Sequence, residues 1–207
     1  MLLAEPMTVA TDWLLALVVG FWALRLWRQP QASARWWAAA FAASALAAAT
    51  GGAAHGFAPY LNPLAKQLIW KVTVLSVGLA SFCMLVGAGR VSFGARLWSW
   101  LLGAALLKFS LYTVWMLGHD AFIYVIYDYG SAMLLVFALQ LHRLLRRADP
   151  AARWILGGIV VAFVGAAVQA SKLQMHAYFN HNDLYHLIQI GAFYLLWRGG
   201  QRFSDHP

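Results

Sequence analysis

Residues 153–173 read RWILGGIVVAFVGAAVQASKL, and the eighteen residues between Arg153 and Lys172 include no charged side chain. A helix that crosses the hydrocarbon core of a bilayer needs about 20 mostly apolar residues, so this stretch predicts a transmembrane helix. Comparable runs recur along the whole chain, and the predicted spans are 11–27, 36–57, 66–88, 95–117, 121–142, 153–173 and 183–198. We therefore expect an all-α polytopic membrane protein with seven transmembrane helices.

The composition agrees with a membrane protein and leaves no room for a separate soluble domain. The chain has 207 residues, of which 62% are hydrophobic and 11% charged. Soluble domains carry about 25% charged residues. We expect one transmembrane domain over residues 1–207, and the sequence does not indicate an oligomeric state. The net charge of +8 would suit a nucleic acid, but the arginines cluster between the apolar runs, so no nucleic-acid partner is expected.

The basic residues predict the orientation in the membrane. One set of loops and span ends holds all eleven arginines of the chain: Arg25, Arg28, Arg35, Arg90, Arg96, Arg143, Arg146, Arg147, Arg153, Arg198 and Arg202. The opposite set holds Glu5, Asp12, Lys66, His119 and Asp120. Because cytoplasmic loops are enriched in Lys and Arg, the N-terminus is expected outside and the C-terminus in the cytoplasm. The expected location is the plasma membrane, as in the inner membrane of a bacterium.

Polar side chains gather where two of the predicted spans reach the outer leaflet. His55 ends the second span, and His181, Asp183 and His186 begin the last one. Ionisable residues inside a membrane are costly and so indicate function by default. Asp183 and His186 are three residues apart and share a helix face, while His181 precedes the regular helix and can fold back toward them. These residues predict a site near the outer leaflet.

Two interpretations of these residues stay open. Asn182 or Asp183 can cap the last helix, and His55 can be a hydrogen-bonded interfacial histidine. Alternatively His55 and His186 bind one metal ion with a third group from His181, Asn182 or Asp183. Imidazole and carboxylate suit zinc, and three protein ligands plus a water form a catalytic site. A zinc-bound water is a nucleophile near neutral pH.

Two further charged residues lie deep within predicted spans. Lys108 is about fourteen residues from the inner end of the fourth span, and Asp128 is about eight residues from the outer end of the fifth. At about 1.5 Å per residue in a core of about 30 Å, both come to a similar depth. We expect a Lys108–Asp128 ion pair. The alternative is that Asp128 faces the polar site and orients a histidine or a water.

The histidines that end the second span and begin the seventh resemble those of the CREST superfamily, which includes alkaline ceramidases and the progestin–adipoQ receptors. His55 matches the helix-2 histidine, and His186, preceded by Tyr185, matches the second histidine of the helix-7 His-x-x-x-His motif. Asn182 stands at the first histidine of that motif, and Gly51 stands at the family's helix-2 serine. The aspartate that the family carries early in its third helix has no counterpart here.

The resemblance implies seven membrane helices and a zinc ion on three histidines, here His55, His181 and His186. It implies a hydrolase of a lipid amide or ester, similar to a ceramidase, with Asp183 or Asp128 handling the proton. The alternative function is a receptor that binds a lipid or another small ligand in the same polar site without turnover. A transporter is less favoured, because no line of polar residues reaches the cytoplasmic side and no internal repeat is visible.

Overall fold

The computed structural model describes residues 3–173, 176 and 179–205. These residues form seven α-helices and one short 3₁₀ helix, η1. They are α1 (Pro6–Trp27), α2 (Ala32–Phe57), η1 (Ala58–Tyr60), α3 (Pro63–Ser92), α4 (Ala95–Gly118), α5 (Ile123–Arg147), α6 (Pro150–Ala170) and α7 (His181–Gly200). The all-α, seven-helix prediction is confirmed.

The helix ends follow local chemistry and correct several predicted boundaries. Pro6, Pro63 and Pro150 each occupy the first helical position, where the missing N–H costs nothing. Because Pro6 can begin a helix, α1 starts five residues before the predicted span 11–27. The predicted span 153–173 runs too far, since α6 ends at Ala170 and Lys172 has a left-handed backbone with φ of 53°.

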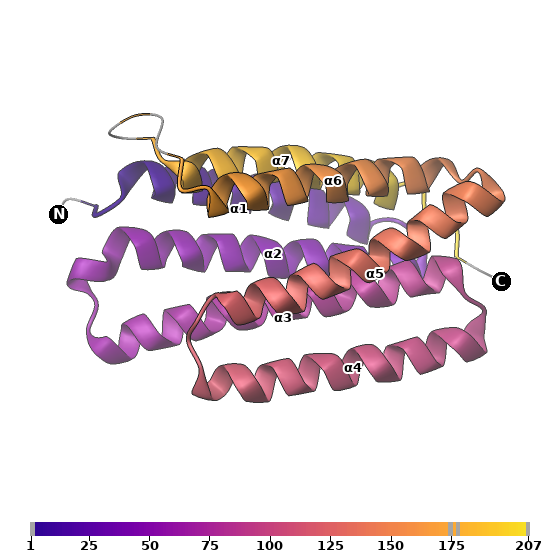
Figure 1. Ribbon diagram of the computed structural model, residues 1–207, viewed down its shortest axis with the longest axis horizontal. Helices are drawn as coiled ribbons and strands as arrows, with labels where there is room; N and C mark the ends of the chain where they lie inside the picture. The colour runs from indigo at the N-terminus through magenta and orange to yellow at the C-terminus, as the bar shows by residue number, and fades with distance from the viewer. Residues whose placement is uncertain (1–2, 174–175, 177–178, 206–207) are drawn as a thin grey trace.

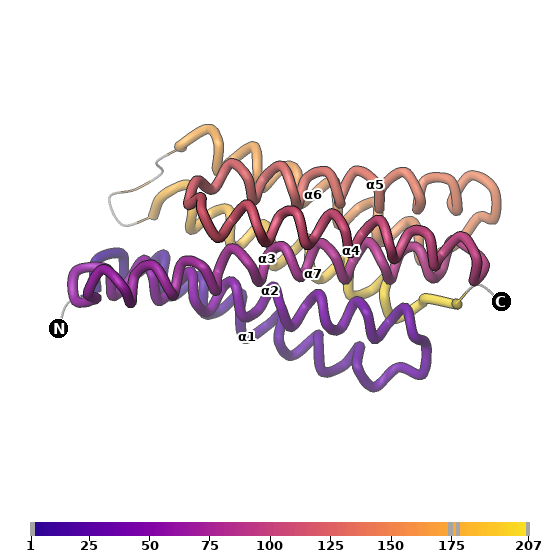
Figure 2. Tube along the Cα trace, turned by 90° about the horizontal axis from the view of Figure 1, so that it is seen from below, coloured from indigo at the N-terminus to yellow at the C-terminus, as the bar shows by residue number. Residues whose placement is uncertain are grey.

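Six helices form a closed circuit of neighbours, and the seventh lies outside it. α1 packs on α2, α2 on α3, α3 on α5, α5 on α6, α6 on α7, and α7 on α1. α4 packs mainly on α3 (Figure 1). Viewed at right angles, the helices run side by side along the long axis of the molecule (Figure 2).

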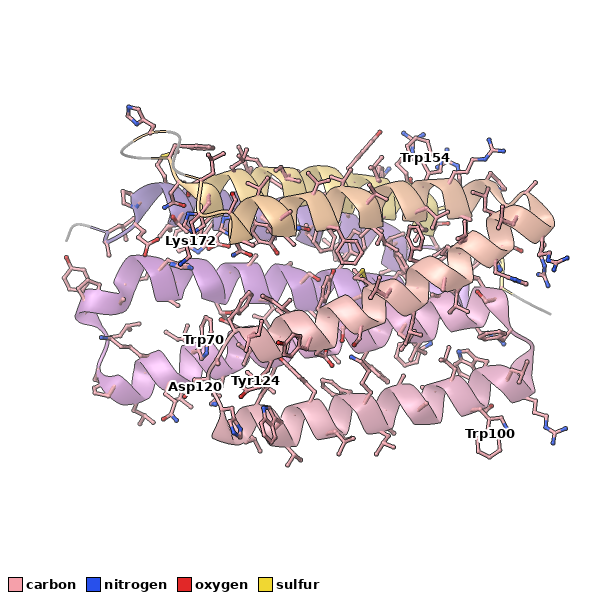
Figure 3. All side chains as sticks on the ribbon, in the orientation of Figure 1. Trp70, Trp100, Asp120, Tyr124, Trp154 and Lys172 are labelled. Carbon is pink, nitrogen blue, oxygen red and sulfur yellow. The ribbon has the colours of Figure 1, made fainter. Side chains whose placement is uncertain are left out.

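Consecutive helices alternate in direction, so the two ends of the bundle differ in chemistry. All eleven arginines fall at the end where α1, α3, α5 and α7 finish and α2, α4 and α6 begin. Trp100 and Trp154 lie toward this end, and Asp120 and Lys172 lie toward the other (Figure 3). Among the described residues, six helices, α1 to α6, are long and apolar enough to cross a membrane. The protein is therefore suited to a membrane.

Aromatic rings pack in the interior toward the arginine end, and polar side chains of α1 and α7 are buried toward the opposite end. Trp37 lies edge-on against Phe203 at 5.1 Å between ring centroids, and Phe41 against Phe193 at 5.0 Å. Toward the opposite end, the buried side chains of α1 and α7 are largely polar: Thr8, Thr11, Asp12, Asp183, His186 and Gln189. Because buried ionisable groups in a membrane protein indicate function, the cluster of Asp12, Asp183 and His186 is a candidate site.

Candidate functional site

α1 and α7 meet through a chain of three hydrogen-bonding side chains. His186 Nε2 lies 3.1 Å from Asp12 Oδ1, and His186 Nδ1 lies 2.9 Å from Thr11 Oγ1. All three residues are at most 7% exposed. The hydroxyl of Thr11 also lies 3.0 Å from the Met7 carbonyl and 3.1 Å from that of Thr8. We call Thr11, Asp12, Asp183 and His186 the polar cluster.

The hydrogen atoms of this chain have three possible arrangements. A neutral His186 can donate to Asp12 and accept from Thr11. It can instead donate to Thr11, whose own proton then goes to a carbonyl of α1, and accept from a protonated Asp12. A charged His186 donates to both residues. In every arrangement both ring nitrogens are used, so His186 can pass a proton between a hydroxyl and a carboxyl group.

Asp183 both caps α7 and leaves one carboxylate oxygen unused. Its Oδ2 accepts a hydrogen bond from the Asn180 N–H at 2.7 Å, within a capping box that includes the Asn180 side chain. The capping alternative is thus confirmed for Asp183. The residue is 1% exposed, and its Oδ1 is buried without a hydrogen-bond partner in the described part of the chain. Asp183 lies close enough to Asp12 and His186 to interact electrostatically with both.

His55 lies at the open side of the polar cluster and not within its hydrogen-bonded chain. Its Nδ1 is 3.4 Å from Glu5 Oε1, and the two side chains are 37% and 43% exposed. Gly52, one turn earlier on α2, lets α2 approach α1, because a Cβ there would lie 2.9 Å from the Cβ of Asp12.

The predicted zinc ligands are not arranged as a metal centre. Within the described residues, no group of three His, Cys, Asp or Glu side chains is placed to hold a metal ion. His186 uses both nitrogens within the protein, and His55 contacts Glu5. His181 begins α7 and is half-buried. The donors therefore do not fit a zinc ion on three histidines, and elemental analysis of the purified protein tests whether zinc is bound.

Asp128 belongs to a second buried site, on the α3–α4–α5 side of the bundle. Its Oδ1 forms an ion pair with Lys108, whose ammonium also donates to the Asp128 carbonyl at 2.8 Å. Its Oδ2 accepts a hydrogen bond from Ser81 at 2.5 Å. The predicted ion pair is confirmed. Because both carboxylate oxygens are engaged there, the alternative in which Asp128 orients a histidine of the polar site is wrong for this arrangement.

A family model covers nearly all of this architecture, matching residues 7–205. The chain belongs to DUF6962. This family is described only as one of unknown function, and nothing in the match links it to the CREST superfamily. No curated protein and no solved structure matches the chain. The function of this member of DUF6962 therefore has to be argued from its own residues.

Sequence reasoning missed the contribution of α1 to the site. Thr11 and Asp12 lie at the beginning of the predicted span 11–27. The sequence pattern indicates Asp12 only as one of the charges on the outer side of the membrane. The signal was present, because Asp12 lies six residues inside α1 and an ionisable residue within a span indicates function. What the sequence does not show is that α1 packs beside α7.

Proposed function

We propose that this chain is a membrane hydrolase that cleaves an amide or ester bond of a lipid at the polar cluster. The observation that carries the proposal is the hydrogen-bonded chain Thr11–His186–Asp12. A hydroxyl within reach of an imidazole, which a carboxylate orients in turn, is the arrangement that activates hydroxyl nucleophiles. The site lies at the membrane end where lipid headgroups and acyl carbonyls are found, which favours a lipid substrate.

The proposal includes seven spans in the plasma membrane, with the N-terminus outside and the C-terminus in the cytoplasm. The eleven arginines at one end support this orientation. α7 is not among the six helices that are apolar enough to cross a membrane by composition alone. It has 20 residues and packs between α1 and α6, so it would cross the membrane beside them. Its polar first turns, which lower its hydropathy, then face α1 inside the protein.

In the reaction, His186 acts as the general base and then as the general acid. The proton of the Thr11 hydroxyl moves to His186 Nδ1 while Thr11 Oγ1 attacks the carbonyl carbon of the lipid. The C–N or C–O bond to the leaving group breaks, and the leaving group takes the proton from His186. Water, deprotonated by His186, then releases the fatty acid from Thr11. Asp12 stabilises the imidazolium at each step.

Asp183 would position the substrate and not transfer a proton. Its buried Oδ1 can accept a hydrogen bond from a donor on the lipid, such as an amide N–H or a hydroxyl group. A buried acceptor without a partner lowers the stability of the free protein by about 1–3 kcal/mol. A ligand that donates a hydrogen bond to this oxygen removes that cost, which favours binding. Access would be from the outer end, past the exposed pair of His55 and Glu5.

The unpartnered Oδ1 of Asp183 also favours a second candidate function, a receptor that binds the lipid without cleaving it. An unpartnered carboxylate oxygen needs only a ligand donor, whereas turnover also needs the chain of Thr11, His186 and Asp12. The two functions therefore differ in which substitutions matter. Removing Asp183's charge weakens binding in both, but removing the Thr11 hydroxyl affects only the hydrolase.

The test uses the purified full chain in detergent with an N-acyl sphingoid lipid and with a diacylglycerol. We expect release of fatty acid from one of them. Thr11→Val, which is nearly isosteric, and His186→Gln should each lower kcat by at least about a hundredfold, the usual contribution of a general base. Asp183→Asn keeps an oxygen for the helix cap, so it should raise KM while the unfolding temperature stays near that of the wild type.

Thr113→Val is the matched control, because Thr113 lies on α4, outside the polar cluster. It should leave turnover unchanged. If neither lipid is cleaved but one of them raises the unfolding temperature, and Asp183→Asn abolishes that shift, the receptor function replaces the hydrolase. If Thr11→Val turns over as fast as the wild type, the proposed nucleophile is wrong.

A further inference from the structure

The arginine end of the bundle contains a pocket that is rich in hydrogen-bond donors. It is shallow and open to solvent, has a volume of about 430 Å³, and is lined by Gln29 just after α1, by Trp197 and Arg198 in the last turn of α7, and by Gln201 and Arg202 just after α7. Apart from the two glutamine carbonyl groups, its side chains offer donors or cations. No carboxylate lines it. Such a pocket is suited to an anion.

Its two guanidinium groups are held in place by contacts with aromatic side chains. Arg198 Cζ lies 4.7 Å and Arg202 Cζ lies 5.4 Å from the centroid of the same Trp154 ring on α6. Arg198 also donates to the Tyr194 hydroxyl at 2.8 Å. In the described part of the chain neither arginine forms an ion pair with a carboxylate. Two positive charges fixed on one indole ring form a prepared anion site.

Two other arginines at this end form ion pairs. Arg143 forms an ion pair with Asp149, and Arg90 lies 3.9 Å from Asp205. Trp197, which lines the pocket, has an indole N–H that is buried without an acceptor among the described residues. The carbonyl groups at the end of α7 would repel an anion through the helix dipole. This effect is reduced because Arg202 donates to the Arg198 carbonyl at 2.7 Å, and two full charges exceed the half charge of the dipole.

We propose that this pocket binds the phosphate group of an anionic membrane lipid. Guanidinium groups bind phosphate through paired, charge-assisted hydrogen bonds. The tryptophans around the pocket favour the headgroup level of a bilayer, and basic pockets at the ends of membrane helices bind anionic headgroups. This site lies at the opposite end of the bundle from the polar cluster, so it is independent of the proposed hydrolase.

The test measures binding of short-chain phosphatidylglycerol to the purified full chain in zwitterionic detergent by calorimetry. The other titrants are short-chain phosphatidylcholine and inorganic phosphate. We expect saturable binding of the anionic lipid only. Arg198→Gln and Arg202→Gln should each weaken it by about tenfold or more, since each removes charge-assisted hydrogen bonds. Arg198→Lys, which keeps the charge but loses the planar fork, should weaken it several-fold.

Arg146→Gln is the control, because Arg146 is exposed at the same end but does not line the pocket. It removes the same charge and should leave the affinity within about twofold. Equal losses in Arg146→Gln and Arg198→Gln would mean that only the general positive field attracts the lipid, and would overturn the pocket. Inorganic phosphate binding as tightly as the lipid would overturn the lipid as its source. The unfolding temperature without lipid shows that each variant is folded.

Discussion

Removing Lys108 should destabilise the protein more than removing the charge of its partner Asp128. The side chain of Asp128 is 5% exposed and that of Lys108 is 28% exposed. Lys108→Met leaves a buried carboxylate with only the Ser81 hydroxyl as a neighbouring donor. Breaking a buried pair in this way costs about 3–5 kcal/mol. Asp128→Asn leaves an amide that still accepts hydrogen bonds, and its cost should be nearer to about 1–3 kcal/mol.

The double variant should recover much of this loss, because no unpaired charge remains. A thermal-unfolding double-mutant cycle in detergent measures the coupling free energy, and neighbours in one network usually show about 0.5–3 kcal/mol. Ser81→Ala serves as a matched control, since it removes one hydrogen bond but leaves the ion pair. A coupling free energy near zero, or a larger loss for Asp128→Asn than for Lys108→Met, would contradict the argument from burial.

Three further outcomes are expected. Gly52→Val should lower the free energy of unfolding by about 1–3 kcal/mol, as judged by thermal melts, because even a Cβ at this position would lie 2.9 Å from that of Asp12; an unchanged melt would mean that α1 and α2 are farther apart. Elemental analysis of protein never exposed to chelators should find no stoichiometric zinc, and one zinc per chain that is lost in both His55→Ala and His186→Ala would restore the predicted metal centre. Reporter fusions after Arg147 and at the C-terminus should both read cytoplasmic, and an external signal from either would reverse the topology.

The sequence predicted the helices and one buried pair because both depend on quantities that are local along the chain. Apolar length decides whether a segment can span a membrane, and all seven predicted spans overlap a helix. The Lys108–Asp128 pair followed from helical rise alone, since two opposite charges at equal depth on consecutive helices can meet. The alternating direction of consecutive spans likewise predicts that all eleven arginines lie at one end of the bundle.

The partners of His186 could not be predicted in this way. Depth arithmetic places His55, Asp12 and His186 within the same third of the bundle, but it does not say which helices are neighbours. α1 packs against both α2 and α7, so its Thr11 and Asp12 occupy both nitrogens of the His186 ring. His55 consequently meets Glu5 at the open side. Which helix stands between two others is set by packing along their full length.

The charges of the polar cluster explain why a ligand is expected there at all. Glu5, Asp12 and Asp183 are close to the imidazole rings of His55 and His186. Buried carboxylates that share a site repel one another, and a buried oxygen without a partner costs free energy. A folded protein keeps such costs at sites where function requires them, so the ligand should bring the hydrogen-bond donor that Asp183 lacks.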